Sequence, residues 1–183
     1  SEAQHDVLLV HCGRLSPEKK ADRSINTLIT LSKRGVRARL VVAGDGPTRA
    51  ELERQARGYP VTFLGFVPER TRLARLLASA DVVLAPGPLE TFCLAALEAL
   101  ASGTPVVASA SSAVREVIGI DEGIASTGAI ADNTPSHFAD AVQRVLLTPL
   151  GERRAACRAR ARQFPWSSTI DQMLALHNAT RAQ

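Results

Sequence analysis

Two basic side chains share a short segment whose composition suits phosphate binding. Arg14 and Lys19 stand in Gly13 to Lys20, which directly follows an apolar run. Arginine offers a planar fork to phosphate oxygens and lysine a mobile point charge, so the pair suits a diphosphate. The spacing alone leaves open the alternative that Arg14 caps a carboxylate and Lys19 is only solvated.

Two carboxylates bracket a second segment, Pro86 to Glu98. We expect Glu90 in a loop, Glu98 on the second turn of a helix, and the free backbone amides of the helix start between them. Amides receive phosphate or sugar oxygens, and carboxylates accept hydrogen bonds from the vicinal hydroxyls of sugars. Glu90 can instead be an ordinary helix N-terminal carboxylate, and Glu98 a surface residue. The apolar surroundings of Glu98 favour a functional partner for it.

Other candidate motifs favour structural roles. Gly44-Asp45-Gly46-Pro47 is neither a dinucleotide fingerprint nor a Walker loop, and it predicts a tight turn leading into a Pro-initiated helix. The four histidines have no metal-ligand spacing, and His11 is interpreted as a packed strand residue. Three widely spaced cysteines favour neither a disulfide framework nor a zinc site, and they fit a reducing cytosol. We predict no metal site.

The elements that position these residues alternate between strands and helices. Amphipathic stretches lie between short apolar runs and predict helices on both faces of a doubly wound parallel α/β sheet. In such sheets the loops after the strands bind ligands. The runs that we predict as strands are Val7 to His11, Leu40 to Ala43, Val61 to Leu64, Val82 to Ala85 and Pro105 to Ala108.

The pattern loosens after Ile118. We expect one more strand at Gly123 to Ser126 and helices near 135–147, 151–163 and 167–180. The 183 residues fit one domain, with a core at about 7–150 and C-terminal helices at about 151–183. Because the chain opens Ser-Glu-Ala-Gln-His without Met and runs quickly into a core-like strand, we expect an excised domain.

Composition narrows the class of protein. With 45% hydrophobic and 22% charged residues, the chain is predicted to be globular rather than disordered. Few aromatic residues and no basic stripe argue against nucleic acid. No signal segment or spanning apolar run is present. The late arginines are interpreted as the solvated face of a helix rather than a membrane-docking patch; they are Arg153, Arg154, Arg158, Arg160 and Arg162.

The motifs in their order resemble a known family. Five motifs follow one another along the chain: Gly-Arg-x4-Lys, Gly-Asp-Gly-Pro, Phe-Leu-Gly-Phe-Val at Phe63 to Val67, Glu-x7-Glu, and Ala-Ser-Gly-Thr-Pro-Val-Val-Ala. This order resembles the C-terminal donor-binding domain of family-four GT-B retaining glycosyltransferases, a Rossmann-like half of that fold. Within the family, the chain looks most similar to actinobacterial GDP-mannose-dependent α-mannosyltransferases that act on glycolipids.

The resemblance implies a role for each matching residue. Arg14 and Lys19, after Gly13, would bind the donor diphosphate and support its departure, and Glu90 would contact the hydroxyls of the transferred sugar. Glu98 would hold the ribose, backbone groups of Phe66 and Val67 would meet the base, and the amides of Thr91, Phe92, Cys93 and Leu94 would meet sugar and phosphate. Two positions depart from the family, which usually has Gly in place of Cys93 and Lys20.

The resemblance also implies partners and a location. The donor is a nucleoside diphosphate sugar, with GDP-mannose favoured; no metal or cofactor takes part, and the acceptor is a lipid-linked or other glycan. The acceptor-binding N-terminal domain is absent, so the isolated domain is expected to be inactive in transfer. We expect the protein to lie in the cytoplasm, and a peripheral position at the inner face of the cell membrane is the alternative. A UDP-sugar-dependent transferase, a nucleotide-sugar epimerase, a dinucleotide-binding module and an interaction module are the alternatives.

Overall fold

The computed structural model describes residues 6–119 and 124–165. Seven strands form one sheet in the order β3-β2-β1-β4-β5-β7-β6. The first six in this order are parallel, and β6 is antiparallel to β7. The strands are β1 (Val7–Cys12), β2 (Ala38–Ala43), β3 (Val61–Gly65), β4 (Val82–Ala85), β5 (Val106–Ser109), β6 (Ile124–Ala125) and β7 (Gly128–Ala131).

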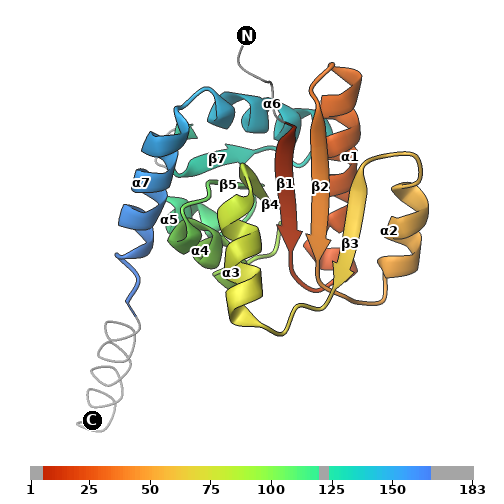
Figure 1. Ribbon diagram of the computed structural model, residues 1–183, viewed down its shortest axis with the longest axis horizontal. Helices are drawn as coiled ribbons and strands as arrows, with labels where there is room; N and C mark the ends of the chain where they lie inside the picture. The colour runs from red at the N-terminus through yellow and green to blue at the C-terminus, as the bar shows by residue number, and fades with distance from the viewer. Residues whose placement is uncertain (1–5, 120–123, 166–183) are drawn as a thin grey trace, which may run out of the picture.

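Helices cover both faces of the sheet, which confirms the predicted doubly wound α/β architecture (Figure 1). One face carries α1 (Ala21–Lys33), α2 (Arg49–Gln55) and α6 (Pro135–Leu146). The other carries α3 (Arg70–Ser79), α4 (Leu94–Ser102), α5 (Val114–Ile118) and α7 (Leu150–Ala161). Each side has its own apolar core, because alternate strand residues point to opposite faces. Leu9 of β1 belongs to the α1 core and Val10 to the α4 core.

The prediction for the chain after Ile118 needs correction. The strand expected at 123–126 is the two-residue β6, and the sixth parallel strand is the unpredicted β7. Its sequence Gly-Ala-Ile-Ala has one strong β-former, so its pairing with β5 decides its conformation rather than propensity. Helices α6 and α7 match two predicted helices, whereas the one predicted near 167–180 lies outside the described residues.

The start of α2 also differs from expectation. Pro47 does not open the helix, which begins at Arg49 after Thr48. The Thr48 amide and hydroxyl both bond to the Leu15 carbonyl, at 3.1 and 2.9 Å. The turn after β2 is therefore tied to the loop after β1 before the helix starts.

The arginines of α7 are not a solvated face, and this prediction was wrong for three of the five. Arg153 is buried and donates to the Asp81 carbonyl. Arg154 donates to the Ala78 carbonyl, and Arg160 to the carbonyls of Val117 and Glu116. The carbonyls bonded by Arg154 and Arg160 lie in the last turns of α3 and α5, where carbonyls lack intrahelical partners and attract cations. Arg158 and Arg162 are exposed, as expected.

The strand order creates a switch point between β1 and β4. The connections from β1 run outward to β2 and β3, and those from β4 run the opposite way to β5 and β7. The loops that leave β1 and β4 therefore diverge at the same edge of the sheet. Figure 1 shows the arrowheads of β1, β2 and β3 at this edge, in the lower part of the view. Ligands of open α/β sheets bind in the crevice outside such a point.

Candidate functional site

The loops after β1 and β4 meet at the switch point through an ion pair. Lys19 Nζ donates to Glu90 Oε1 at 2.6 Å. The Glu90 side chain is 14% exposed and that of Lys19 is 34% exposed, so water screens the pair only partly. The fold thus joins one cation of the first predicted segment to one carboxylate of the second.

A hollow of about 420 Å³ lies at the carboxyl ends of β1, β2 and β3. Four predicted residues line it, namely Gly13, Arg14, Phe66 and Val67, together with Cys12, Ala43, Gly44, Asp45 and Leu73. Phe66 is 75% exposed. Arg14 is also exposed, and its side chain makes no hydrogen bond or ion pair within the described residues. A mostly apolar hollow with a free guanidinium at its rim suits a flat ring joined to an anion.

The loop after β4 leads directly into the N-terminus of α4. Glu90 lies in this loop, as predicted, and the helix begins at Leu94. Thr91, Phe92 and Leu94 are exposed. The Ala96 amide donates to the Cys93 carbonyl at 2.9 Å. The amides that precede it at the helix start have no intrahelical acceptor in a regular helix, and they concentrate partial positive charge beside the Lys19–Glu90 pair. This arrangement can receive a phosphate or hydroxyl oxygen.

Two residues of the site hold a left-handed backbone. Lys20 has φ 53° and Cys93 has φ 56°, and both precede a helix as its N-cap residue. Only glycine adopts this conformation without a steric cost. These are the two positions at which the resembling family usually has Gly. Lys20 and Cys93 therefore keep the left-handed backbone that a glycine would have at each position, and they add a side chain there.

Glu98 lies on the second turn of α4, as predicted. It lines a groove of about 210 Å³ between α3 and α4, together with Arg70 and Ser102. Leu73 borders both this groove and the hollow that contains Phe66. Because Glu98 is half-buried rather than buried, its carboxylate reaches water despite the apolar sequence around it. The groove extends the site along α3.

Distant segments brace the loop after β4, and sequence reasoning missed them. Arg23 of α1 donates to the Pro86 carbonyl at 2.6 Å and to Asn133 Oδ1 at 2.8 Å. The Ala113 amide donates to the Glu90 carbonyl at 3.0 Å. Phe164, just after α7, meets Phe92 edge to face with ring centroids 6.2 Å apart. No local motif marks these partners, because each contact joins separate elements.

His11, Cys12 and Cys93 are buried or half-buried near the same edge. His11 Nδ1 lies 2.9 Å from Ser24 Oγ, which confirms it as a packed strand residue. Burial, with a smaller contribution from Lys19, lowers the pKa of His11 to about 4. Burial also raises the pKa values of the Cys12 and Cys93 thiols to about 11, so both are protonated at neutral pH.

The second glycine motif is structural, as predicted. A Cβ on Gly44 would lie 1.8 Å from the Gly13 carbonyl oxygen, and one on Gly46 would lie 2.3 Å from that of Leu15. These glycines let the loops after β1 and β2 pack directly against each other. Their role is close approach of backbone to backbone.

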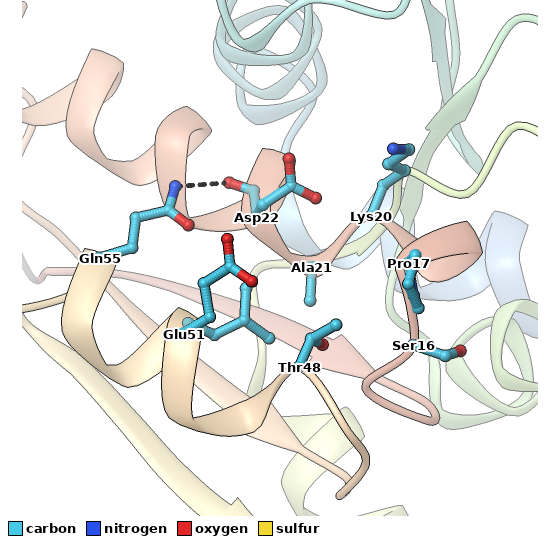
Figure 2. Close-up of a pocket in the computed structure, with 9 residues that line it drawn as sticks. Ser16, Pro17, Lys20, Ala21, Asp22, Thr48, Glu51 and Gln55 are labelled. Carbon is cyan, nitrogen blue, oxygen red and sulfur yellow. Dashed lines mark hydrogen bonds between the residues drawn. The ribbon is translucent and has the colours of Figure 1, made fainter.

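A further hollow of about 350 Å³ lies on the other side of the first loop, between the starts of α1 and α2. Figure 2 shows it enclosed by Ser16, Pro17, Lys20, Asp22, Glu51 and neighbouring residues, with Gln55 donating to the Asp22 carbonyl. None of the predicted site residues lines it. Its mixture of exposed charges of both signs indicates no particular ligand.

The described residues contain neither a metal-binding cluster nor a membrane-spanning helix. No group of three or more His, Cys, Asp and Glu side chains gathers there in a way that could hold a metal ion. Within the same residues, no helix has the length and apolar content needed to cross a membrane.

Solved structures with this fold define the class of protein first. The chain aligns over 96% of its length with Anabaena HepE in complex with UDP-glucose, with a TM-score of 0.78 and 22% identity, and covers 49% of that chain. It aligns over 98% with a sucrose-phosphate synthase of Thermosynechococcus elongatus, with a TM-score of 0.78 and 29% identity, covering 46%. The fold is that of one half of a GT-B glycosyltransferase.

Sequence comparison then gives the family. Residues 2–164 match the family described as Glycosyl transferases group 1, and the chain belongs to that family. It is 55% identical over 169 residues to a GDP-mannose-dependent alpha-(1-6)-phosphatidylinositol dimannoside mannosyltransferase of Mycobacterium tuberculosis, covering 92% of this chain and 43% of the relative. It is 35% identical to a D-inositol 3-phosphate glycosyltransferase of Actinosynnema mirum, covering 96% and 45%. The chain thus spans less than half the length of these relatives.

Proposed function

We propose that this chain is the donor-binding half of a retaining, metal-independent mannosyltransferase that uses GDP-mannose. The observation that carries the proposal is the Lys19–Glu90 pair at the switch point, between the hollow lined by Phe66 and the N-terminus of α4. The name of the mycobacterial relative, 55% identical, supports GDP-mannose. The name of that relative also supports a mannosylated phosphatidylinositol lipid as the acceptor.

Each predicted residue then has a place along the donor. The base enters the hollow beside the backbone of Phe66 and Val67, and the ribose hydroxyls meet Glu98 in the adjoining groove. Arg14 and Lys19 hold the diphosphate. Glu90 accepts hydrogen bonds from the mannose hydroxyls, and the amides of Thr91 to Leu94 meet sugar and phosphate oxygens.

The ion pair prepares the site before the donor arrives. Lys19 and Glu90 neutralise each other at 2.6 Å, so neither charge is left unpaired in a partly buried place. An arriving diphosphate gives Lys19 a second anion, and the mannose hydroxyls give Glu90 neutral donors. The pair therefore needs only a small rearrangement to contact the donor at two points.

Transfer would proceed by cleavage of the bond between the sugar C1 and the β-phosphate oxygen. The acceptor oxygen bonds to C1 from the same face, and its proton passes to the departing diphosphate. Arg14, Lys19 and the α4 N-terminus stabilise the negative charge that develops on the leaving group. The acceptor would be held by an N-terminal domain, so this half alone binds donor and does not transfer sugar.

Calorimetric titration of the chain with GDP, UDP, ADP and NAD, in the presence of EDTA, tests the proposal. We expect GDP to bind best and the double variant Arg14→Ala with Lys19→Ala to lose at least about tenfold in affinity, since each cation contributes a charge-assisted contact. Lys33→Ala with Arg39→Ala is the matched control, because it removes the same charge from exposed residues elsewhere. Binding of NAD alone would support a dinucleotide module, and tighter binding of UDP a UDP-sugar donor.

A further inference from the structure

A buried histidine lies directly behind the Lys19–Glu90 pair, and the donor roles proposed above do not use it. His11 is 3% exposed and belongs to β1, one residue before that strand ends. Its Nδ1 contacts Ser24 Oγ of α1 at 2.9 Å. This contact fixes the ring between the sheet and the helix. Because burial lowers its pKa to about 4, the imidazole is neutral at neutral pH and carries one ring proton.

The hydrogen-bond network assigns that proton to Nε2. Ser24 is fully buried, and His11 Nδ1 is the only partner of its hydroxyl within the described residues. If Nδ1 donated to Ser24, the hydroxyl hydrogen would be buried without an acceptor, which is costly. When Ser24 donates to Nδ1 instead, the Ser24 hydroxyl and Nδ1 are both satisfied, the proton lies on Nε2, and only the Nε2–H group still needs an acceptor. The free end of the ring is then a hydrogen-bond donor.

His11, which carries this donor, lines a small cavity of the site. His11 Nε2 is fully buried and has no partner among the described residues. His11 lines a cavity of about 20 Å³ together with Lys19, Glu90 and apolar residues that include Val83 and Ala96. A cavity of this size has room for one water molecule, and the side chains of His11, Lys19 and Glu90 offer it polar groups. In the described structure the Lys19 bond uses only one of the two Glu90 oxygens, so the other can accept a second bond.

We propose that one ordered water occupies this cavity, accepts a hydrogen bond from His11 Nε2–H and donates one to the Glu90 carboxylate. His11 is then a positioning residue: through the water it holds Glu90 in the orientation in which it meets the sugar of the donor. A buried water is normally held by two to four polar groups, and His11, Glu90 and Lys19 supply them. The water is a property of this structure, whereas its effect on donor binding rests on the proposed function.

The decisive variant is His11→Leu combined with Ser24→Ala, which removes both partners of the buried bond and leaves no orphaned polar group. We expect it to fold with a melting temperature near that of the wild type and to bind GDP-mannose about tenfold more weakly, as expected for one lost bond to a charged group. The affinity of this variant for GDP, which lacks the sugar, should fall less than its affinity for GDP-mannose. His11→Gln, which keeps an N–H near the position of Nε2, should recover binding to within about threefold.

Two controls separate positioning from a structural role. Thr127→Val removes another buried hydrogen bond, from the Thr127 hydroxyl to the Ile118 carbonyl, just before β7 and away from the carboxyl ends of the strands, and should leave donor affinity unchanged. A high-resolution crystal structure of the wild-type chain should show the water within hydrogen-bond distance of His11 Nε2 and Glu90, and that of the Leu–Ala variant should not.

The positioning role is overturned if the double variant binds GDP-mannose as tightly as the wild type, and the water is overturned if the wild-type cavity is dry. A wild-type chain that binds no nucleotide sugar but holds the bridging water would remove the proposed function and leave the water site standing. A chain that binds GDP-mannose but has a dry cavity would support the proposed function and remove the water site.

Discussion

The two sides of the site are built differently. The β1–β3 side, formed by Gly13, Gly44 and Phe66 with their neighbours, is joined backbone to backbone. The Gly13 amide bonds to the Ala43 carbonyl at 3.0 Å and the Gly44 amide to that of Gly65 at 2.8 Å. The β4 loop, Pro86 to Cys93, is held largely by the side chains of Lys19, Arg23 and Phe164.

This difference separates a fixed surface from an adjustable one. Backbone contacts on the β1–β3 side leave the shape of the hollow independent of most side chains, apart from the glycines that permit them. In the β4 loop, single side-chain changes can alter the position of Glu90 without disturbing the sheet. We therefore expect the first side to respond to substitution by unfolding and the second by changes in donor affinity.

The largest effect should follow from breaking the backbone contact itself. Gly44→Ala places a Cβ 1.8 Å from the Gly13 carbonyl oxygen, so one loop must move. We expect a loss of about 3 kcal/mol or more in the free energy of unfolding, at the upper end of overpacking costs. Urea unfolding followed by circular dichroism measures it. Gly151→Ala, where the added Cβ meets no atom within 4 Å, is the control. Equal stability of both variants would contradict a backbone-built side.

The second effect concerns His11, which belongs to β1 on the first side and lines a cavity with Glu90 on the second. Its pKa is about 4 in the folded chain and its ordinary value is 6.5, so between these values the unfolded chain binds the extra proton. This group therefore does not change the stability above pH 6.5, and the protein loses stability as the pH falls from 6.5 towards 4. The loss over this range is about 3 kcal/mol. Unfolding at pH 7.0, 5.5 and 4.5 should show less pH dependence in the His11→Leu, Ser24→Ala variant; an unchanged profile would contradict the assignment.

A smaller effect should come from the side-chain brace of the β4 loop. Phe164→Ala removes the edge-to-face contact with Phe92, and such pairs are worth about 1 kcal/mol. We expect donor affinity to fall about threefold to tenfold by calorimetry, because the loop that carries Glu90 loses one support. Phe164→Tyr keeps the ring and should bind as the wild type does. Tyr59→Ala, at an exposed aromatic residue elsewhere, should also have no effect.

The smallest effect on stability concerns Cys93, the residue of the β4 loop with a left-handed backbone. Cys93→Gly relieves a conformation that costs a non-glycine residue about 1–2 kcal/mol, and it adds about 0.5–1 kcal/mol of unfolded-chain entropy. The free energy of unfolding of the Cys93→Gly variant should be about 0.5 kcal/mol higher than that of the wild type, as measured by thermal unfolding. Ala95→Gly, in the first turn of α4, should instead lose about 1 kcal/mol. A loss at both positions would mean that the Cys93 side chain stabilises the loop.

The sequence allows prediction of those parts of the fold and site that depend on short-range patterns. The apolar runs fixed five strands to within two residues at each end, and the loops that carry Arg14, Lys19 and Glu90 follow from them. Strand β7 could not be found, because Gly128 to Ala131 has little β-propensity and depends on β5. Long-range partners such as Arg23 with Pro86 leave no local signal. The roles of the predicted site residues remain predictions.

The arginines of α7 have a consequence for where this fold can be cut. Their guanidinium groups complete the hydrogen bonding of carbonyls at the ends of α3 and α5, and Arg158 lies against Gly103 at the end of α4. Cys157 of the same helix is buried in the core. A truncation before residue 150 would expose those carbonyls and open that core. A shortened chain that keeps these contacts must therefore include α7 and Phe164, whose ring reaches the β4 loop.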